Sequence, residues 1–135
     1  IWTIHNQTHA VIVDPGDSQP VLDFLDSNDL TLSGILITHH HADHIGGIKN
    51  IIGKNDVPVY GPKTENIPNI SHKLVEGDEV RLEQLGLSFT VLDIPGHPRD
   101  TSLILMTNGC FVATLCSRVV VGESLKARRH KCLTP

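Results

Sequence analysis

The sequence has few aromatic residues and no long apolar run. Aromatic side chains make up 4% of the 135 residues, with one Trp and one Tyr. No apolar run approaches the roughly 18 residues of a membrane-spanning helix, so we expect no membrane partner. The first residues, Ile-Trp-Thr-Ile-His, lack the basic start and the long apolar stretch of a secretory signal. We therefore expect a cytoplasmic chain whose length suits one domain.

A basic excess is also absent. The chain has 11 Lys and Arg against 15 Asp and Glu, so its formal net charge is -4. Nucleic-acid binding relies on Lys and Arg to neutralise phosphates, so this charge argues against a nucleic-acid partner. We expect a monomer that acts on a small molecule.

Apolar periodicity predicts a mixed α/β chain up to residue 97. Alternating or continuous apolar runs bounded by turn residues indicate strands, and apolar residues at helical spacing indicate helices. Expected strands are 2–4, 9–13, 34–38, 57–60, 80–82 and 87–92, and expected helices are 20–25 and 45–52. The expected fold class is therefore α/β, with sheets covered by helices.

The composition changes at residue 97. Residues 1–97 contain 5 basic and 13 acidic side chains, a net charge of -8, whereas residues 98–135 contain 6 basic and 2 acidic, a net charge of +4. All three cysteines follow residue 97, and eight of the nine histidines lie at or before it. Such an asymmetry often marks a tail that binds an acidic partner, which is one interpretation of residues 98–135. Within them 102–105 and 119–121 are candidate strands, and 126–131 has no apolar face and is not expected to pack.

A histidine-rich turn follows the apolar run at residues 34–38. Four imidazoles and one carboxylate occur within six positions: His39, His40, His41, Asp43 and His44. On an extended segment His39 and His41 point to the same side and His40 points away. Asp43 and His44 come after the chain turns into a helix, so they can face the same cavity from another angle. Imidazole and carboxylate are zinc ligands, and two ligand pairs suit two adjacent metal ions.

Two other interpretations of this turn carry no metal. The histidines can be a solvent-exposed accident, and Asp43 can simply cap the following helix. The buried strand before the turn and Gly46-Gly47 after it favour the metal site. Glycines at that point would let the backbone pass close to a bound ion.

The pattern His-x-His-x-Asp-His after an apolar strand resembles the metallo-β-lactamase superfamily. Three further segments make the chain similar to the hydroxyacylglutathione hydrolase (glyoxalase II) family. They are Asp14-Pro15-Gly16-Asp17, Val59-Tyr60-Gly61-Pro62 and Pro95-Gly96-His97. The resemblance covers nearly all of residues 1–97. It implies the N-terminal half of an αββα sandwich, that is, an incomplete hydrolase domain.

The resemblance also implies a ligand set. His39, His41 and His97 would bind a first metal ion, and Asp43 and His44 a second. Two zinc ions are expected, with iron or manganese as possible replacements. His40 would support the turn without binding metal.

The implied reaction is hydrolysis of a glutathione thioester. The substrate would be S-D-lactoylglutathione, formed in methylglyoxal detoxification, and the products glutathione and D-lactate. A metal-bound water would attack the thioester, so no protein nucleophile is needed. No substrate-binding residue is assigned. Persulfide dioxygenases, which use a single iron, and other hydrolases of the superfamily remain alternatives.

After His97 the sequence departs from the family pattern. The family continues with Thr-x-Gly-His and reaches Gly-Asp-Thr-Leu-Phe, whose Asp bridges both metal ions. Here the chain continues Pro-Arg-Asp-Thr, and Asp100 and Glu123 are the only carboxylates that follow. A third possibility is therefore an inactive metal-binding remnant.

A shifted reading frame accounts for this departure. With permitted codons, Arg99 to Leu103 can be translated one base earlier as Gly-His-Ile-Ala, and Val112 to Ser117 as Gly-Asp-Thr-Leu-Phe. The same shift turns all of 99–135 into a family-like string without a forced stop. We therefore expect residues 98–135 to result from a single-base deletion after the His97 codon and to form no domain. The three cysteines would then be accidents of the frame, and the present chain an impaired enzyme.

Overall fold

Two β-sheets and three α-helices make up the part of the chain that the computed structural model describes, residues 1–93, 103–107, 110–113 and 126–129. The first half contains β1 (Trp2–His5), β2 (His9–Val13), α1 (Gln19–Ser27), β3 (Thr31–Leu36), α2 (Ala42–Ile45), α3 (Ile48–Lys54) and β4 (Val59–Pro62). It is followed by β5 (His72–Leu74), β6 (Glu79–Leu82), the 3-10 turn η1 (Glu83–Leu85), β7 (Leu87–Asp93), β8 (Leu103–Thr107), β9 (Cys110–Ala113) and β10 (Lys126–Arg129).

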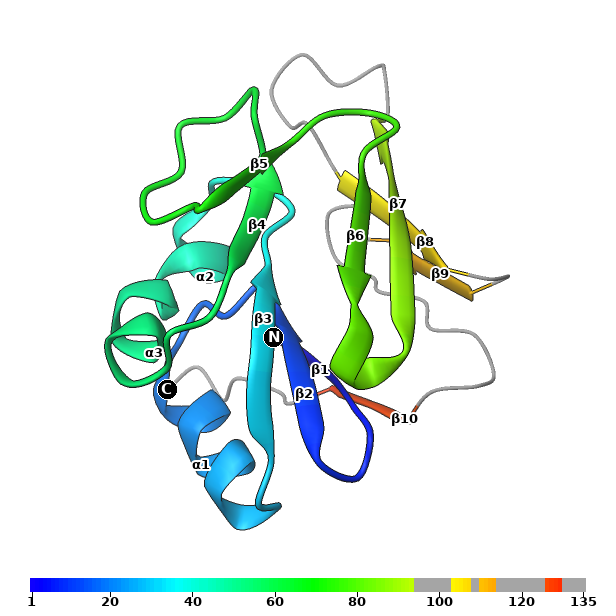
Figure 1. Ribbon diagram of the computed structural model, residues 1–135. Coiled ribbons are helices and arrows are strands. Elements are labelled where there is room, and N and C mark those ends of the chain that lie inside the picture. The colour runs from blue at the N-terminus through cyan, green and yellow to red at the C-terminus, as the bar shows by residue number, and fades with distance from the viewer. Residues whose placement is uncertain (94–102, 108–109, 114–125, 130–135) are drawn as a thin grey trace.

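The two sheets differ in strand direction. The first has the order β10-β1-β2-β3-β4-β5, and its strands from β2 to β5 are parallel. The second, β6-β7-β8-β9, is antiparallel throughout. The three helices cover one face of the first sheet, and the second sheet lies on its other face (Figure 1). The predicted α/β class is confirmed.

Alternate residues of the central strands serve two separate cores. On β2, Val11 and Val13 pack toward the second sheet, with Phe89 and Val91. Ala10 and Ile12 of the same strand pack toward the helices, with Val21 and Ile51 among others. Side chains alternate between the faces of a strand, so a strand buried on both faces must be apolar throughout. This is why the continuous apolar runs predict the strands well.

The helix expected at 45–52 is instead two helices. α2 ends at Ile45 and α3 begins at Ile48, with Gly46-Gly47 between them. The turn after β2 lies against this break, and the N–H of Gly47 donates to the carbonyl of Pro15 at 2.7 Å. A Cβ on Gly47 would lie 2.7 Å from that same oxygen and 2.6 Å from the carbonyl carbon of Asp17. These glycines were expected to let the backbone pass close to a bound ion. In the structure they let it pass close to the turn after β2.

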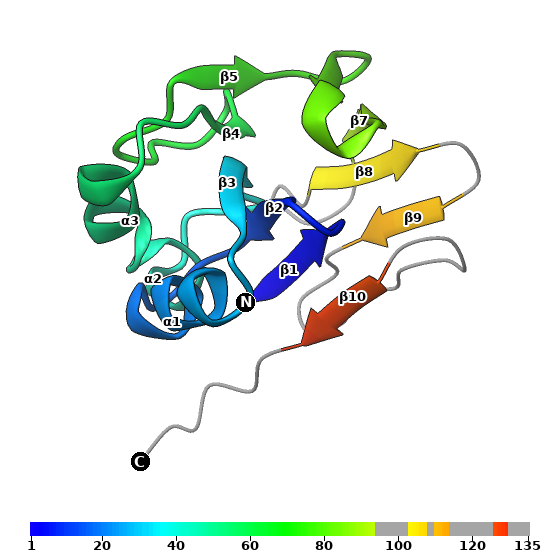
Figure 2. The same cartoon turned by 60° about the horizontal axis from the view of Figure 1, so that its bottom comes forward.

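The expectation that 126–131 does not pack is wrong for its first four residues. Lys126–Arg129 forms β10, which pairs antiparallel with β1 at the edge of the first sheet (Figure 2). Strand pairing uses backbone groups, so a segment without an apolar face can still add to a sheet edge. The candidate strand at 102–105 corresponds to β8, whereas 119–121 lies outside the described residues. Among the described residues, no helix has the length and hydropathy to cross a bilayer.

Substituting alanine for two glycines should separate this packing from helix propensity. Gly47→Ala places a methyl group against backbone atoms and should lower the free energy of unfolding by about 1–3 kcal/mol. Gly53 lies within α3, and a Cβ at this position would meet no atom within 4 Å. Gly53→Ala should therefore be neutral or stabilise the fold by up to about 1 kcal/mol. Urea unfolding of both variants measures the difference. Equal stabilities for the two variants would contradict the packing described for Gly47.

Candidate metal centre

The candidate site lies where the parallel strands of the first sheet end. Asp14 follows β2, and Thr38 and His39 follow β3, its parallel neighbour. Carboxyl ends of adjacent parallel strands meet at one edge of a sheet, where α/β proteins place their ligand sites. All three side chains are buried, with exposed fractions of 2%, 2% and 5%. Buried polar groups of this kind need partners, and they supply them to one another.

The Asp14 carboxylate fixes the start of the histidine turn. The N–H of Thr38 donates to its Oδ1 at 2.9 Å, and the Thr38 hydroxyl donates to its Oδ2 at 2.7 Å. The hydroxyl oxygen also lies 2.9 Å from Nδ1 of His39. Because the single hydroxyl proton goes to Asp14, Nδ1–H of His39 must donate in this second bond. His39 is therefore the tautomer whose Nε2 keeps its lone pair.

Burial favours the same form of His39. Desolvation lowers the pKa of His39, and the neighbouring His44 lowers it further, which outweighs the opposite effect of Asp14. His39 is thus held neutral, with Nε2 free to accept. Metal ligation requires a neutral imidazole, and a hydrogen bond from its other nitrogen is the usual way to fix the tautomer.

Asp14 also holds His44, from α2. Nδ1 of His44 lies 3.0 Å from Oδ2 of Asp14. This interaction raises the pKa of His44 above its ordinary value, against the lowering effect of burial, and Asp43 contributes in the same direction. Asp14 has a positive φ of 51°, a conformation that Asp tolerates better than most residues. One carboxylate thereby ties together the end of β2, the end of β3 and α2.

The structure brings four of the predicted ligands together in two pairs. Nε2 of His39 lies 3.1 Å from Nδ1 of His41, and Nε2 of His44 lies 3.5 Å from Oδ2 of Asp43. The rings of His39 and His44 are in contact, with centroids 3.9 Å apart. The fifth predicted ligand, His97, lies outside the described residues.

The donor set fits a metal ion of the zinc, iron or manganese type. Three imidazoles and a carboxylate are the ligands that such ions take. Within the described residues, however, no group of three or more His, Cys, Asp or Glu side chains is arranged to hold a metal ion. Each pair offers two donors, so a complete site needs a further ligand.

Asp14 and Glu65 belong to this region, and the sequence pattern assigned neither of them a role. Asp14 stands directly after an apolar strand, as Thr38 and His39 do after theirs, and that shared position is the signal that could have found it. Glu65, on the loop after β4, has its Oε2 3.0 Å from Nδ1 of His40. Nothing in the sequence links Glu65 with His40, which lies 25 residues before it.

The other histidines of the described residues make different contacts. The ring of His5 packs against Phe24, and that of His72 against Tyr60. His9 lies beside the hydroxyl of Thr8. His130 lies outside the described residues.

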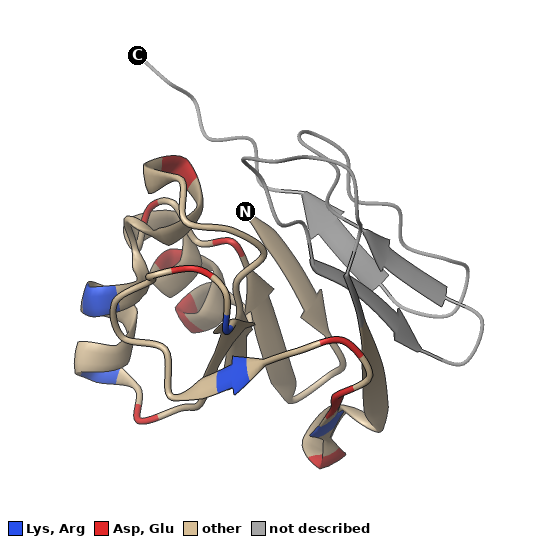
Figure 3. Ribbon diagram, turned by 90° about the horizontal axis from the view of Figure 1, so that it is seen from above, with Lys and Arg blue, Asp and Glu red and all other residues tan. Residues whose placement is uncertain are grey.

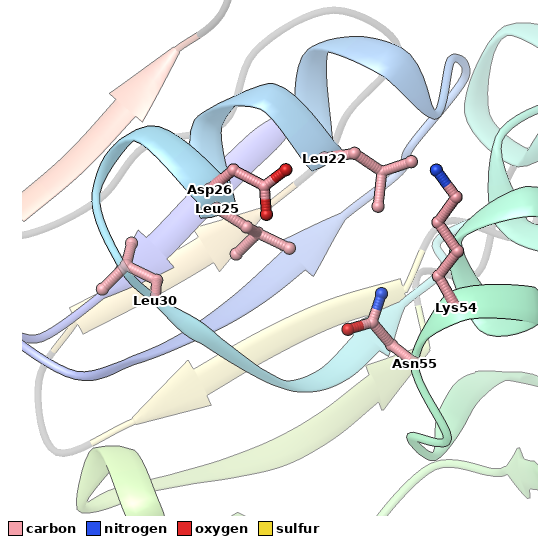
Figure 4. Close-up of a pocket in the computed structure, with 6 residues that line it drawn as sticks. All are labelled: Leu22, Leu25, Asp26, Leu30, Lys54 and Asn55. Atoms are coloured by element: carbon pink, nitrogen blue, oxygen red, sulfur yellow. The ribbon is translucent and has the colours of Figure 1, made fainter.

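The basic residues and the pocket described for this chain do not involve the histidine turn. Viewed from above, the basic positions are dispersed over several elements of the ribbon (Figure 3). They are Lys49 and Lys54 on α3, Lys63 after β4, Lys73 on β5 and Arg81 on β6. A separate pocket lies between α1 and the end of α3, at the opposite edge of the sheet (Figure 4). It is lined by Leu22, Leu25, Asp26, Leu30, Lys54 and Asn55, a set without histidine.

The described residues thus combine a two-sheet α/β fold with paired histidine and aspartate side chains at the ends of its parallel strands. Residues 1–109 match the family described as the metallo-beta-lactamase superfamily, and the chain belongs to that superfamily.

Relatives narrow this assignment. The chain is 50% identical over 97 residues to the hydroxyacylglutathione hydrolase of Nitrosomonas europaea, an alignment that covers 72% of this chain and 37% of that protein. The structure is similar to that of ETHE1 from Myxococcus xanthus, with 32% identity, a TM-score of 0.62 and coverage of 78% of this chain and 47% of that one. BLEG-1 B3 metallo-beta-lactamase, at 23% identity and a TM-score of 0.66, shares the fold over 78% of this chain and 60% of its own. The predicted relationship to hydroxyacylglutathione hydrolases is confirmed, and the chain spans less than half the length of that relative.

The role of Asp14 can be tested in the metal-free chain. In Asp14→Asn the pKa of His44 should fall, because the charge that raises it is gone, and NMR titration of the His44 ring measures this. The Asp14–His44 interaction should stabilise the fold fully below the ordinary histidine pKa of about 6.5. That contribution is lost as the pH rises through the raised pKa of His44.

The variant should therefore be destabilised more at acidic than at alkaline pH, with a loss of about 1–3 kcal/mol from the disturbed Thr38 hydrogen bonds at either pH. Asp56→Asn, at an exposed position, is the matched control and should change neither quantity. An unchanged pKa of His44 in Asp14→Asn would refute the contact.

Proposed function

We propose that the chain carries the metal-binding half of a thioester hydrolase site. The observation that supports this most directly is the pairing of His39 with His41 and of Asp43 with His44 around the buried Asp14. His39 and His41 would hold one metal ion, with His97 as the further ligand, and Asp43 and His44 would hold a second. Bound metal of this kind supplies a water nucleophile at neutral pH and polarises the carbonyl under attack.

The residues of this chain have distinct tasks in that site. Thr38 keeps the proton of His39 on Nδ1 and leaves Nε2 for the metal. Asp14 orients the His44 ring and leaves its Nε2 beside Asp43. The exposed Asp43 carboxylate, with 80% of its side-chain surface accessible, can be reached by a ligand from solvent.

The proposed substrate is a glutathione thioester, S-D-lactoylglutathione, cleaved to glutathione and D-lactate. This step rests on the 50% identity to a hydroxyacylglutathione hydrolase. Persulfide dioxygenase activity is the alternative. Metal content distinguishes it from thioester hydrolysis, since the dioxygenase needs a single iron and consumes oxygen.

We also propose that residues 98–135 are translated from a shifted frame and that the chain as given lacks the carboxylate that would bridge the two metal ions. The change from a net charge of -8 to one of +4 at residue 97 and the family-like string in the alternative frame support this. Without the bridging ligand, metal would bind but the thioester would not be hydrolysed at an enzyme's rate.

Metal binding tests the first proposal. The purified chain, freed of metal and titrated with Zn²⁺ against a chromophoric chelator, should bind the ion. His41→Ala should weaken this binding by more than about tenfold, since it removes a direct ligand. His72→Ala, an exposed histidine on β5, should bind as the unaltered chain does. Equal affinity of the two variants would contradict the ligand assignment.

A restored reading frame tests the second proposal. Inserting one base after the His97 codon should give a protein that hydrolyses S-D-lactoylglutathione with a kcat of roughly 1–1000 per second, the usual range for enzymes. The chain as given should show background hydrolysis only. Sequencing that finds a different alternative frame, or turnover at an enzyme's rate by the chain as given, would overturn the proposal. Oxygen uptake by an iron-loaded, frame-restored protein would instead identify the dioxygenase.

A further inference from the structure

The carboxylate of Glu65 faces the histidine turn from a separate part of the chain. Only 9% of its side-chain surface is exposed, and its Oε2 lies 3.0 Å from Nδ1 of His40. A carboxylate withdrawn from water is costly unless a partner compensates it. His40, by contrast, is half exposed, with 51% of its side-chain surface accessible. The Glu65 carboxylate is therefore largely shielded from solvent, whereas the imidazole ring that it contacts lies at the surface.

The backbone around Glu65 is held in place. The carbonyl of Glu65 accepts from the N–H of Ile67 at 3.2 Å, and Ile67 is buried in the core beneath the helices. Just before Glu65, the N–H of Lys63 donates to the carbonyl of Leu74 at 2.9 Å, next to the β4–β5 pair. The carboxylate thus projects from a fixed loop and acts as a fixed anchor for His40.

His40 stands between the two histidines that form the first ligand pair. The residue before the turn, Thr38, is fixed by Asp14, and the carbonyl of His41 accepts from the N–H of His44 at 2.9 Å, where α2 begins. Because peptide groups are planar, fixing the central residue of such a short turn restricts the orientation of both neighbours. A contact on the side of His40 therefore restricts the backbone from which the rings of His39 and His41 project.

We propose that Glu65 is a positioning residue, which holds His40 so that His39 and His41 are arranged to receive a metal ion. This inference rests on the proposed metal centre. Glu65 acts through His40 and is not itself a ligand. The hydrogen bond to His40 Nδ1 is the feature that matters, so an uncharged acceptor of the same shape can replace the carboxylate.

Co²⁺ binding by the full-length chain, followed by its visible absorption, tests this proposal. Glu65→Ala should weaken binding about tenfold or more, the size of effect seen when a group supporting a metal ligand is removed. Glu65→Gln keeps an acceptor for Nδ1–H of His40 and should restore most of the affinity and the absorption spectrum. Glu76→Ala, at an exposed glutamate on another loop, is the control and should bind as the unaltered chain does.

His40→Ala separates positioning from direct ligation. It should lower the affinity as much as Glu65→Ala does, and the double variant should be no weaker than either single one, because both remove the same interaction. Because His40 is half exposed, this variant also covers the case in which Glu65→Ala fails to fold. If Glu65→Gln binds as weakly as Glu65→Ala while His40→Ala binds normally, Glu65 is a ligand and the proposal is overturned.

A measurement on the metal-free chain tests the positioning role of Glu65 independently of metal binding. Long-range ¹H–¹⁵N spectra should show shifted ring resonances of His39 and His41 in Glu65→Ala and unshifted ones in Glu76→Ala. If the unaltered chain binds no Co²⁺ but these resonances shift, the metal centre is refuted and the positioning contact stands. If the resonances and the affinity are both unchanged in Glu65→Ala, the positioning role is refuted whatever the chain binds.

Discussion

The buried carboxylate of Asp14 is the interaction on which the histidine site depends. It lies where two parallel strands end, and it accepts from the backbone and the hydroxyl of Thr38 while it faces the ring of His44. A carboxylate that is 2% exposed is tolerable only because these groups replace the water it has lost. Its two oxygens thereby connect three segments that are far apart in sequence, and the histidine rings are oriented from the core outward.

The position of this carboxylate follows from the packing of the central strands. Since β2 carries one core on each face, neither a change of register nor a tilt is possible without disturbing both. The ends of β2 and β3 are therefore fixed, and the turns that leave them begin from defined points. Gly46 and Gly47 complete the arrangement because their missing side chains let α2 and α3 approach the turn after β2.

The sequence predicted those features that depend on the type and spacing of residues that are close along the chain. Continuous apolar runs predicted the buried strands, and the alternation of His39 and His41 predicted which rings pair. The break at Gly46-Gly47 was missed because apolar spacing continues across it from Ile45 to Ile48 and shows nothing of the backbone packed against it. Glu65 owes its importance to a neighbour 25 residues away, and such a contact leaves no local pattern. Asp14 was missed although it stands directly after an apolar strand, because its partner Thr38 is 24 residues away. The pairing of Lys126–Arg129 with β1 was missed for a related reason, since backbone pairing does not depend on an apolar face.

The short helix α2 has a consequence for the order in which the site assembles. None of its four residues is fully buried, although the partly buried Ile45 packs against the core beneath the helices. Two further contacts hold it: the ion pair of His44 with Asp14 and the close approach of Gly46 and Gly47 to the neighbouring turn. Both contacts are made by the chain's own residues, so they order His44 beside Asp43. The entropy cost of ordering these two side chains is therefore met during folding and not when a ligand binds.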